Sequence, residues 1–364
     1  MSGREHIGLM AGLLSTNLYA IFMKFTMGVT PGISFNIPVP AQVVSDYVAE
    51  AERLGYKGIA WLCDSQLIWR DVYVSLALAG AKTSSILLGT GVTNPTTRDA
   101  SVTASAIATL DEATGGRAIL GIGCGDSSVN TLGKSPSSIN SLRTCIEQIR
   151  ILLSGGIVRQ GKHEMKLIWV KRQVPIYIAS TGPRSLELAG EIGDGALINV
   201  GADAGLINWA KAHMQNGANR GQRSINELDI WARITCSISD DPEKARNAVK
   251  GAAATKANGL ARYAQDEYFR SHLSRDLLRD IDLLKEGYNY FEHEKLGARH
   301  AELVTDRIID ALVIAGTPEY CIKRIKSISH ETNVTRLSFA TYGFPDIPGF
   351  LKKFAREVIP AIAE

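Results

Sequence analysis

The chain has 364 residues, of which 45% are hydrophobic and 21% charged, with a formal net charge of +3. This composition is ordinary for a folded globular enzyme, and the small, scattered basic excess argues against a nucleic-acid partner. The five cysteines are odd in number and widely spaced, which excludes a disulfide framework and indicates a reducing compartment. No signal-peptide core and no apolar stretch near 18 residues occurs, so we expect a cytoplasmic protein with no membrane contact.

Short apolar runs rich in β-branched residues alternate with helical patterns along the chain. In chain order, strands are expected at residues 7–12, 59–62, 85–90, 118–122, 175–179, 196–200, 229–237 and 336–340. Helices are expected between and after them, at residues 43–54, 71–82, 101–113, 139–153, 184–192, 204–219, 241–254, 317–329 and 348–359. About eight strand–helix units predict an α/β protein with a parallel sheet closed into a (β/α)8 TIM barrel. An open, doubly wound sheet is the alternative.

Three segments do not fit a minimal barrel, and we treat residues 1–364 as one domain that carries them. Residues 14–40 are expected to be an insertion after strand 1, and residues 157–168 a short hairpin or loop. Residues 259–300, after strand 7, read as a helical insertion rich in Tyr and Phe. Long connections in compact domains are often functional, so this last segment is expected to be a lid or a subunit contact.

Polar residues and glycines interrupt the apolar pattern where each expected strand ends. In barrels of this kind the active site is built from the loops at the carboxyl ends of the strands. The residues that fall there and are candidates for the site are Asp64, Ser65, Gly91, Val92, Thr93, Asn94, Asp126, Thr181, Gly182, Pro183 and Asn199. Each is weak evidence alone, but together they surround one end of the expected barrel.

Several of these residues allow two interpretations. The stretch from Thr181 to Arg184 can bind an anion at a helix N-terminus, or can simply cap the helix. Asp126, in the sequence GIGCGD, can accept a hydrogen bond from a ligand or cap the next segment. Asp64 can hydrogen-bond a ring or substrate, or pair with Arg70 or Arg98. The seven histidines show no metal-binding spacing, so no metal is expected.

Four quoted stretches together carry a family resemblance. They are LLGTGVTNPTTRDASVTASAIATLDEATGGRAILGIGCGD, the LG at 132–133, VPIYIASTGPRSLELAGEIGDGALIN and the late AGTPE. They resemble the luciferase-like superfamily of flavin- and F420-dependent oxidoreductases, and within it the methylenetetrahydromethanopterin reductase-like branch. The match is good from about residue 43 to 199 and absent over 14–40 and 259–300.

The resemblance implies a barrel, commonly dimeric, that binds FMN or coenzyme F420 at its mouth. It implies a backbone bulge behind the cofactor ring, often with a non-proline cis peptide, which would be Gly91–Val92 here. Thr93 and Asn94 would contact the ring or its phosphate-bearing tail, and Thr181, Gly182 and Pro183 would take the phosphate. Asp126 and Asn199 would line the pocket.

One departure affects the cofactor. F420-using relatives commonly carry Asp-His after strand 2, whereas this chain has Asp64 and Ser65, which are the only catalytic candidates and leave the general acid unidentified. We therefore expect a two-component monooxygenase that uses O2 and reduced FMN from a partner reductase on a small organic substrate. The alternative is F420-dependent hydride transfer, and a third hypothesis is flavin binding without catalysis. A homodimer or higher homo-oligomer is expected.

Overall fold

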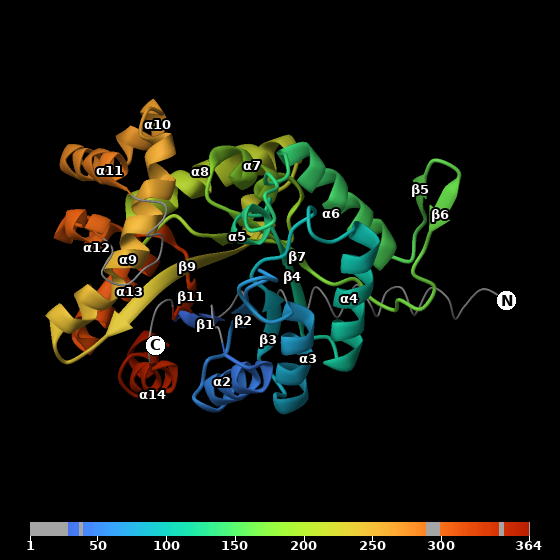
Figure 1. The fold of residues 1–364 in the computed structure, drawn as a ribbon, viewed down its shortest axis with the longest axis horizontal. Helices are drawn as coiled ribbons and strands as arrows, with labels where there is room; N and C mark the ends of the chain where they lie inside the picture. Colours follow the sequence, from blue (N-terminus) through green and yellow to red (C-terminus); the bar gives the residue numbers. More distant parts are fainter. Residues whose placement is uncertain (1–27, 36–38, 289–298, 342–345, 364) are drawn as a thin grey trace.

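The computed structural model describes residues 28–35, 39–288, 299–341 and 346–363. Eight parallel strands close into a barrel in the order β1, β2, β3, β4, β7, β8, β9 and β11, and β11 pairs back to β1. Their bounds are Thr30–Phe35, Ile59–Leu62, Leu87–Thr90, Ala118–Ile122, Ile176–Ser180, Gly195–Ile198, Asp229–Ile238 and Arg336–Ala340. The TIM-barrel prediction is confirmed, and helices surround the strands (Figure 1).

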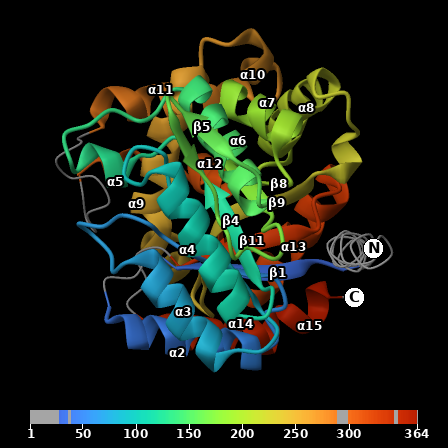
Figure 2. The same ribbon diagram turned by 90° about the vertical axis from the view of Figure 1, so that its right-hand side faces the viewer.

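Most of the helices that follow the strands agree with the sequence pattern to within a few residues. The helices are α2 (Ala41–Arg53), α3 (Val72–Lys82), α4 (Ala100–Ala113), α6 (Ile139–Leu153), α7 (Pro183–Ile192), α8 (Ala204–Arg220), α9 (Pro242–Leu260), α13 (Pro318–Thr332), α14 (Ile347–Glu357) and the short α15 (Ile359–Ile362). Of these, α9 extends six residues beyond the expected end, and the last expected helix is divided into α14 and α15. Several begin at an Asp, Ser or Thr whose side chain accepts a backbone N–H, as Asp71 does for α3 and Ser138 for α6. Figure 2 shows α3 and α4 side by side over the strands.

The first barrel strand is not the one that the sequence pattern indicated. Residues 7–12 lie outside the described residues, and β1, with the sequence TPGISF, pairs with both β11 and β2. The segment 14–40 is therefore not purely an insertion, because it contains this strand. Pro and Gly normally mark turns, so the sequence pattern did not indicate a strand here, although the neighbouring strands β2 and β11 hold it in place.

The segment 259–300 is helical where it is described, as expected. It contains the 3-10 helix η2 (Ala261–Tyr263), α10 (Glu267–Ser271), α11 (Arg275–Gly287) and the start of η4 (Arg299–Leu303). After it come α12 (Asp306–Leu312) and β10 (Val313–Gly316), which pairs with the end of β9 and was not predicted. Ser127–Asn130 form another unpredicted short helix, α5.

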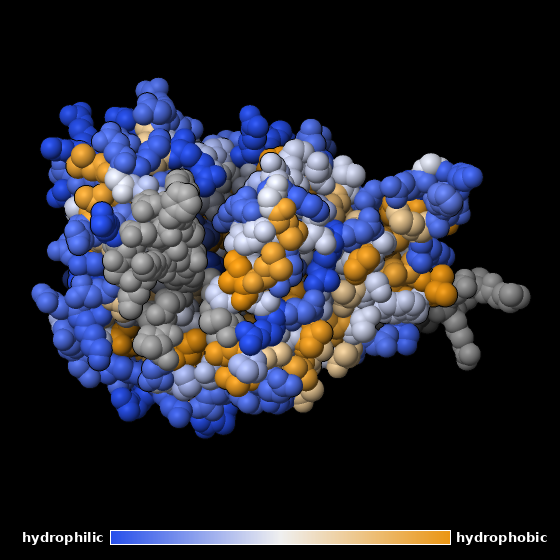
Figure 3. Space-filling view, in the orientation of Figure 1, coloured by the Kyte–Doolittle hydropathy of each residue, from blue (hydrophilic) through white to orange (hydrophobic). Residues whose placement is uncertain are grey.

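The hairpin expected within residues 157–168 is present. Its strands β5 (Val158–Gln160) and β6 (His163–Met165) are antiparallel. Apolar side chains gather on this side of the molecule (Figure 3), where Ile157, Ile168 and Trp169 are 43%, 87% and 39% exposed. Protein–protein contacts often cover such surface, and the expected dimer stays a prediction.

Large aromatic side chains fill the barrel interior, and glycines on neighbouring strands leave room for them. Trp61, Tyr177 and Trp231 belong to one buried cluster, with Trp61 and Tyr177 ring centroids 5.8 Å apart. A Cβ added at Gly89 would lie 2.6 Å from the Trp61 ring, and one at Gly32 would lie 2.6 Å from the Trp231 ring. Trp61 thus fills the barrel interior.

A buried polar group closes the amino-terminal end of the barrel below these rings. The Asp229 carboxylate accepts hydrogen bonds from Tyr177 Oη at 2.5 Å and Trp231 Nε1 at 3.0 Å, and it pairs with Arg336. The side chains of Asp229 and Arg336 are only 17% and 9% exposed. The buried carboxylate therefore has three partners, as a buried charge requires.

Candidate active site at the barrel mouth

The carboxyl ends of the parallel strands place the sequence-selected residues around one mouth. Asp64 and Ser65 follow β2, Gly91 follows β3, and Asp126 comes after β4. The stretch from Thr181 to Pro183 follows β7, and Asn199 follows β8. These residues share one end of the barrel because all eight strands run in the same direction.

The strand end at β3 forms the expected bulge. The peptide bond between Gly91 and Val92 is cis, which confirms the expectation. The Thr90 hydroxyl donates to Gly121 O at 2.7 Å and accepts from Gly121 N at 2.9 Å. Thr93 N then donates to Gly121 O at 3.0 Å, and Gly123 N donates to Thr93 O at 3.0 Å. The segment after β3 is therefore hydrogen-bonded to β4 on both sides of the cis bond.

This bulge presents a small, apolar floor at the mouth. Val92 is partly exposed and packs against the Trp61 cluster, whereas Thr93 beside it is buried. A Cβ added at Gly123 would lie 3.3 Å from Val92 Cγ2 and 3.4 Å from Ala179 Cβ. Val92, Gly123 and Ala179 thus form a surface without large side chains, which suits a planar ring.

Asp64 lies in a buried cluster next to this floor. It is 4% exposed, and its Oδ2 lies 3.5 Å from Arg98 Nε and makes no hydrogen bond. Burial raises the pKa of Asp64, although the nearby Thr93 hydroxyl and the Arg98 charge act in the opposite direction. Arg98 also donates to Asp71 at 2.6 Å and lies 5.0 Å from the centre of the Tyr73 ring. Of the two arginines considered for Asp64, Arg98 is the one found at the carboxylate.

Ser65, Asn94 and Asp126 make contacts within the loops of the mouth. The Ser65 hydroxyl is 2.7 Å from that of Ser127. Asn94 Oδ1 accepts from the backbone N–H groups of residues 96 and 97, each at 3.0 Å, and its Nδ2 donates to Ser128 Oγ at 3.0 Å. Asp126 is exposed and accepts from Asn130 at 3.1 Å. These side chains organise the loops around the floor.

The N-terminus of α7 carries the candidate anion site. Gly182 is the N-cap residue without a side-chain cap, and Pro183 is the first helical residue. Thr181, Gly182 and Pro183 are all partly exposed. Asn199, on the adjacent strand end, has a buried Oδ1 without a hydrogen-bond partner. Unpaired acceptors and helix N–H groups both favour a polar ligand here.

The sequence did not single out Tyr263 of η2 as a site residue. A Cβ on Gly182 would collide with the Tyr263 hydroxyl and lie 2.8 Å from its ring carbon Cζ. The ring also lies 5.7 Å from that of Trp209. The insertion therefore reaches the start of α7. The only signal in the sequence was its richness in aromatic residues.

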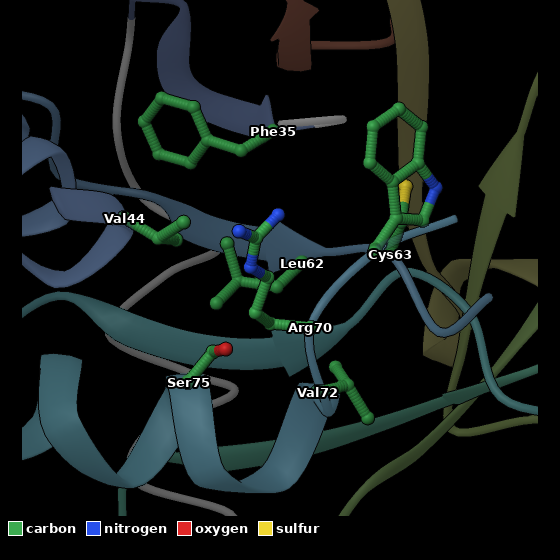
Figure 4. A pocket seen from close by; sticks show the side chains of 8 residues that line it. Phe35, Val44, Leu62, Cys63, Arg70, Val72 and Ser75 are labelled. Carbon is green, nitrogen blue, oxygen red and sulfur yellow. The ribbon is translucent and has the colours of Figure 1, made fainter. Parts of the chain in front are cut away.

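A separate, small recess lies outside the barrel, against the outer face of β2. It is lined by Phe35, Val44, Leu62, Cys63, Trp69, Arg70, Val72 and Ser75. Figure 4 shows the Arg70 guanidinium pointing in among these apolar side chains. Arg70 thus faces this recess.

The described residues contain no group of three or more His, Cys, Asp or Glu side chains that could hold a metal ion. Among the helices of the same residues, none combines the length and apolarity needed to cross a bilayer.

Comparison with known proteins supplies the family. Residues 21–336 match the model of the luciferase-like monooxygenase family. The chain is 31% identical over 344 residues to the 5,10-methylenetetrahydromethanopterin reductase of Methanolobus tindarius, covering 91% of this chain and 99% of that enzyme. It is 35% identical over 219 residues to the F420-dependent hydroxymycolic acid dehydrogenase of Mycobacterium tuberculosis, covering 54% and 59% of the two chains.

A solved structure agrees with this relationship. The coenzyme F420-dependent tetrahydromethanopterin reductase of Methanopyrus kandleri superposes with a TM-score of 0.76 at 27% identity, covering 92% of this chain and 99% of that one. The chain belongs to the luciferase-like monooxygenase family and is an oxidoreductase.

Proposed function

We propose that this enzyme transfers a hydride between coenzyme F420 and a carbon atom of a small organic substrate. The observation that carries the proposal is the end-to-end similarity to methylenetetrahydromethanopterin reductases, at 31% and 32% identity over 91% of the chain. Relatives named as F420-dependent dehydrogenases give further support.

The residues at the mouth fit such a cofactor. The side chains of Val92, Gly123 and Ala179 are small and apolar, which suits the face of a flat ring. The unpaired Oδ1 of Asn199 suits a ring N–H donor. Gly182 and Pro183, at the start of α7, suit a phosphate.

In this proposal F420, when bound, supplies or accepts a hydride at its C5 atom. The bulge at Gly91 and Val92 would support the ring, while Thr93, Asn94 and Asp126 hold the loops around it. Thr181, Gly182 and Pro183 would hold the phosphate of F420 at the start of α7. Orientation by a fixed floor is the protein's main task, because the cofactor carries the redox chemistry.

Asp64 is the proposed proton donor or acceptor for the substrate. Burial raises the pKa of its carboxyl group, which moves its titration closer to neutral pH, where general acid–base catalysis works best. Ser65 is a weaker candidate because its hydroxyl is already paired with Ser127.

The monooxygenase first expected from the sequence has less support. Solved structures named as monooxygenases resemble this chain at 13–19% identity, which shows the shared fold alone. Ser65 is the observation that keeps reduced FMN, with O2 and a partner reductase, as the second candidate, since F420-using relatives commonly carry His there.

Titration of the purified protein with F420 and, under anaerobic conditions, with reduced FMN tests the proposal. We expect saturable quenching of F420 fluorescence with submicromolar affinity and no comparable binding of reduced FMN. The opposite preference would replace the proposal by the monooxygenase.

A further inference from the structure

Arg98 is shared by two carboxyl groups that differ in their surroundings. Its Nη2 donates to Asp71 Oδ2 at 2.6 Å, whereas its Nε lies 3.5 Å from Asp64 Oδ2, which accepts no hydrogen bond. The side chain of Asp71 is 44% exposed and that of Asp64 only 3%. The short, charge-assisted hydrogen bond therefore goes to the carboxylate that water also solvates, and the buried carboxylate receives the weaker contact.

Asp71 holds Arg98 from the start of α3. It is the N-cap residue of this helix, and its Oδ1 accepts from the backbone N–H groups of Tyr73 and Val74, each at 3.0 Å. These two bonds fix the direction of the carboxylate and leave Oδ2 for Arg98. The Arg98 guanidinium also lies 5.0 Å from the centre of the Tyr73 ring. The first turn of α3 thus decides where the guanidinium lies relative to Asp64.

The backbone of Arg98 is fixed by the start of α4. Arg98 directly precedes Asp99, the N-cap residue of that helix, whose side chain accepts from Ser101 N at 2.8 Å. Helices α3 and α4 lie side by side (Figure 2). Both ends of the contact between Arg98 and Asp71 are therefore anchored at a helix start.

This sharing leaves Asp64 with weak compensation for a negative charge. Burial raises the pKa of Asp64, the Thr93 hydroxyl and the Arg98 charge lower it, and the Asp71 charge raises it. Arg70, another basic residue close in the chain, points into the recess outside the barrel (Figure 4). A carboxyl group that is buried and poorly paired favours its neutral form.

We propose that Asp71 is a positioning residue that keeps Arg98 from forming a full ion pair with Asp64, so that Asp64 remains able to carry a proton. Asp71 acts through Arg98, and the inference rests on the proposed function for the role of Asp64. Without the Asp71 charge, Arg98 can bond to Asp64 and favour its charged form. Without the Arg98 charge, the charged form of Asp64 loses its partner. The two substitutions should therefore act on Asp64 in opposite directions.

The ¹³C signal of the Asp64 carboxyl group, followed against pH in protein labelled at its aspartate side chains, measures this pKa directly. Asp64→Asn identifies the signal by its loss. We expect Asp71→Asn, which retains an N-cap side chain, to lower the pKa of Asp64 by at least about 0.5 pH unit, and Arg98→Met to raise it by about one. Asp99→Asn is the matched control, because it removes the same charge from an exposed N-cap residue next to Arg98, and it should leave the pKa unchanged.

An Asp64 pKa in D71N equal to or above that of the wild type would overturn the proposal, as would an equal or lower value in R98M. A decrease in D99N as large as that in D71N would also overturn it, because general loss of negative charge would then explain both. The measurement needs neither cofactor nor substrate, so its failure is distinct from a failure of F420 to bind, which would overturn the proposed function. A melting curve confirms that each variant is folded, and Asp71→Ser or Arg98→Gln serves where D71N or R98M is not.

Discussion

Replacing Gly123 by alanine should weaken cofactor binding and leave the fold intact. The new methyl group would lie 3.3 Å from Val92 Cγ2 and 3.4 Å from Ala179 Cβ, which is tight but free of collision. We therefore expect a stability loss of about 1 kcal/mol or less. If the ring lies on this floor, the methyl group overpacks the complex by about 1–3 kcal/mol. At about 1.4 kcal/mol per tenfold, the dissociation constant of F420 rises roughly 5- to 150-fold.

Gly121→Ala is the matched control, two residues earlier on the same inward face of β4. Its methyl group would collide with the Thr90 carbonyl oxygen and lie 2.9 Å from the Trp61 ring, both of which are fixed. We expect this variant to lose about 2–3 kcal/mol or more of stability. At about 2.1 cal/mol/K per residue this is a fall in Tm of roughly 3–4 °C.

Two measurements check this pair. Fluorescence quenching of F420 gives the dissociation constant, and a thermal melt without cofactor gives the Tm. Wild-type F420 affinity in G123A would refute the placement of the ring over Gly123. A Tm for G121A equal to that of the wild type would refute the view that glycines make room for the aromatic filling.

Asp229→Asn should cost about 3–5 kcal/mol of stability in a chemical unfolding experiment, because it removes the buried carboxylate that pairs with Arg336. Adding Arg336→Met should restore much of the loss, and a double variant less stable than the single one would contradict this. Burial of Glu52 is outweighed by hydrogen bonds from the backbone N–H groups of residues 84–86, which lower its pKa from 4.5 to about 2. A carboxyl group whose pKa is lowered by folding stabilises the fold at pH values above its unfolded pKa, and this stability is lost as the pH falls. Glu52→Gln should therefore reduce the free energy of unfolding at pH 7 and weaken its decrease between about pH 4.5 and 2. Urea unfolding at a series of pH values measures this, and a pH dependence equal to that of the wild type would contradict it. Asp64→Asn should reduce turnover in an F420 absorbance assay by about 10²- to 10⁴-fold with little change in F420 affinity, and full turnover would remove Asp64 from the mechanism.

Local periodicity in the sequence determined most of the elements of this barrel. Strands such as Ile59–Leu62 and Ala118–Ile122 are apolar on both faces, and α6 has a helical repeat with a Ser cap, so their residues alone indicate their state. The family resemblance located the bulge and its cis bond at Gly91–Val92.

Tertiary structure decided the features that depend on residues far apart in the chain. Thr30–Phe35 has the composition of a turn, and it is a strand because β11 and β2 supply its hydrogen bonds from both sides. Arg98 rather than Arg70 reaches Asp64 because the chain turns between them, and no local pattern records that turn. The approach of Tyr263 to Gly182 spans about 80 residues. Such contacts depend on how whole elements pack together, whereas periodicity indicates only which face of a single element is apolar.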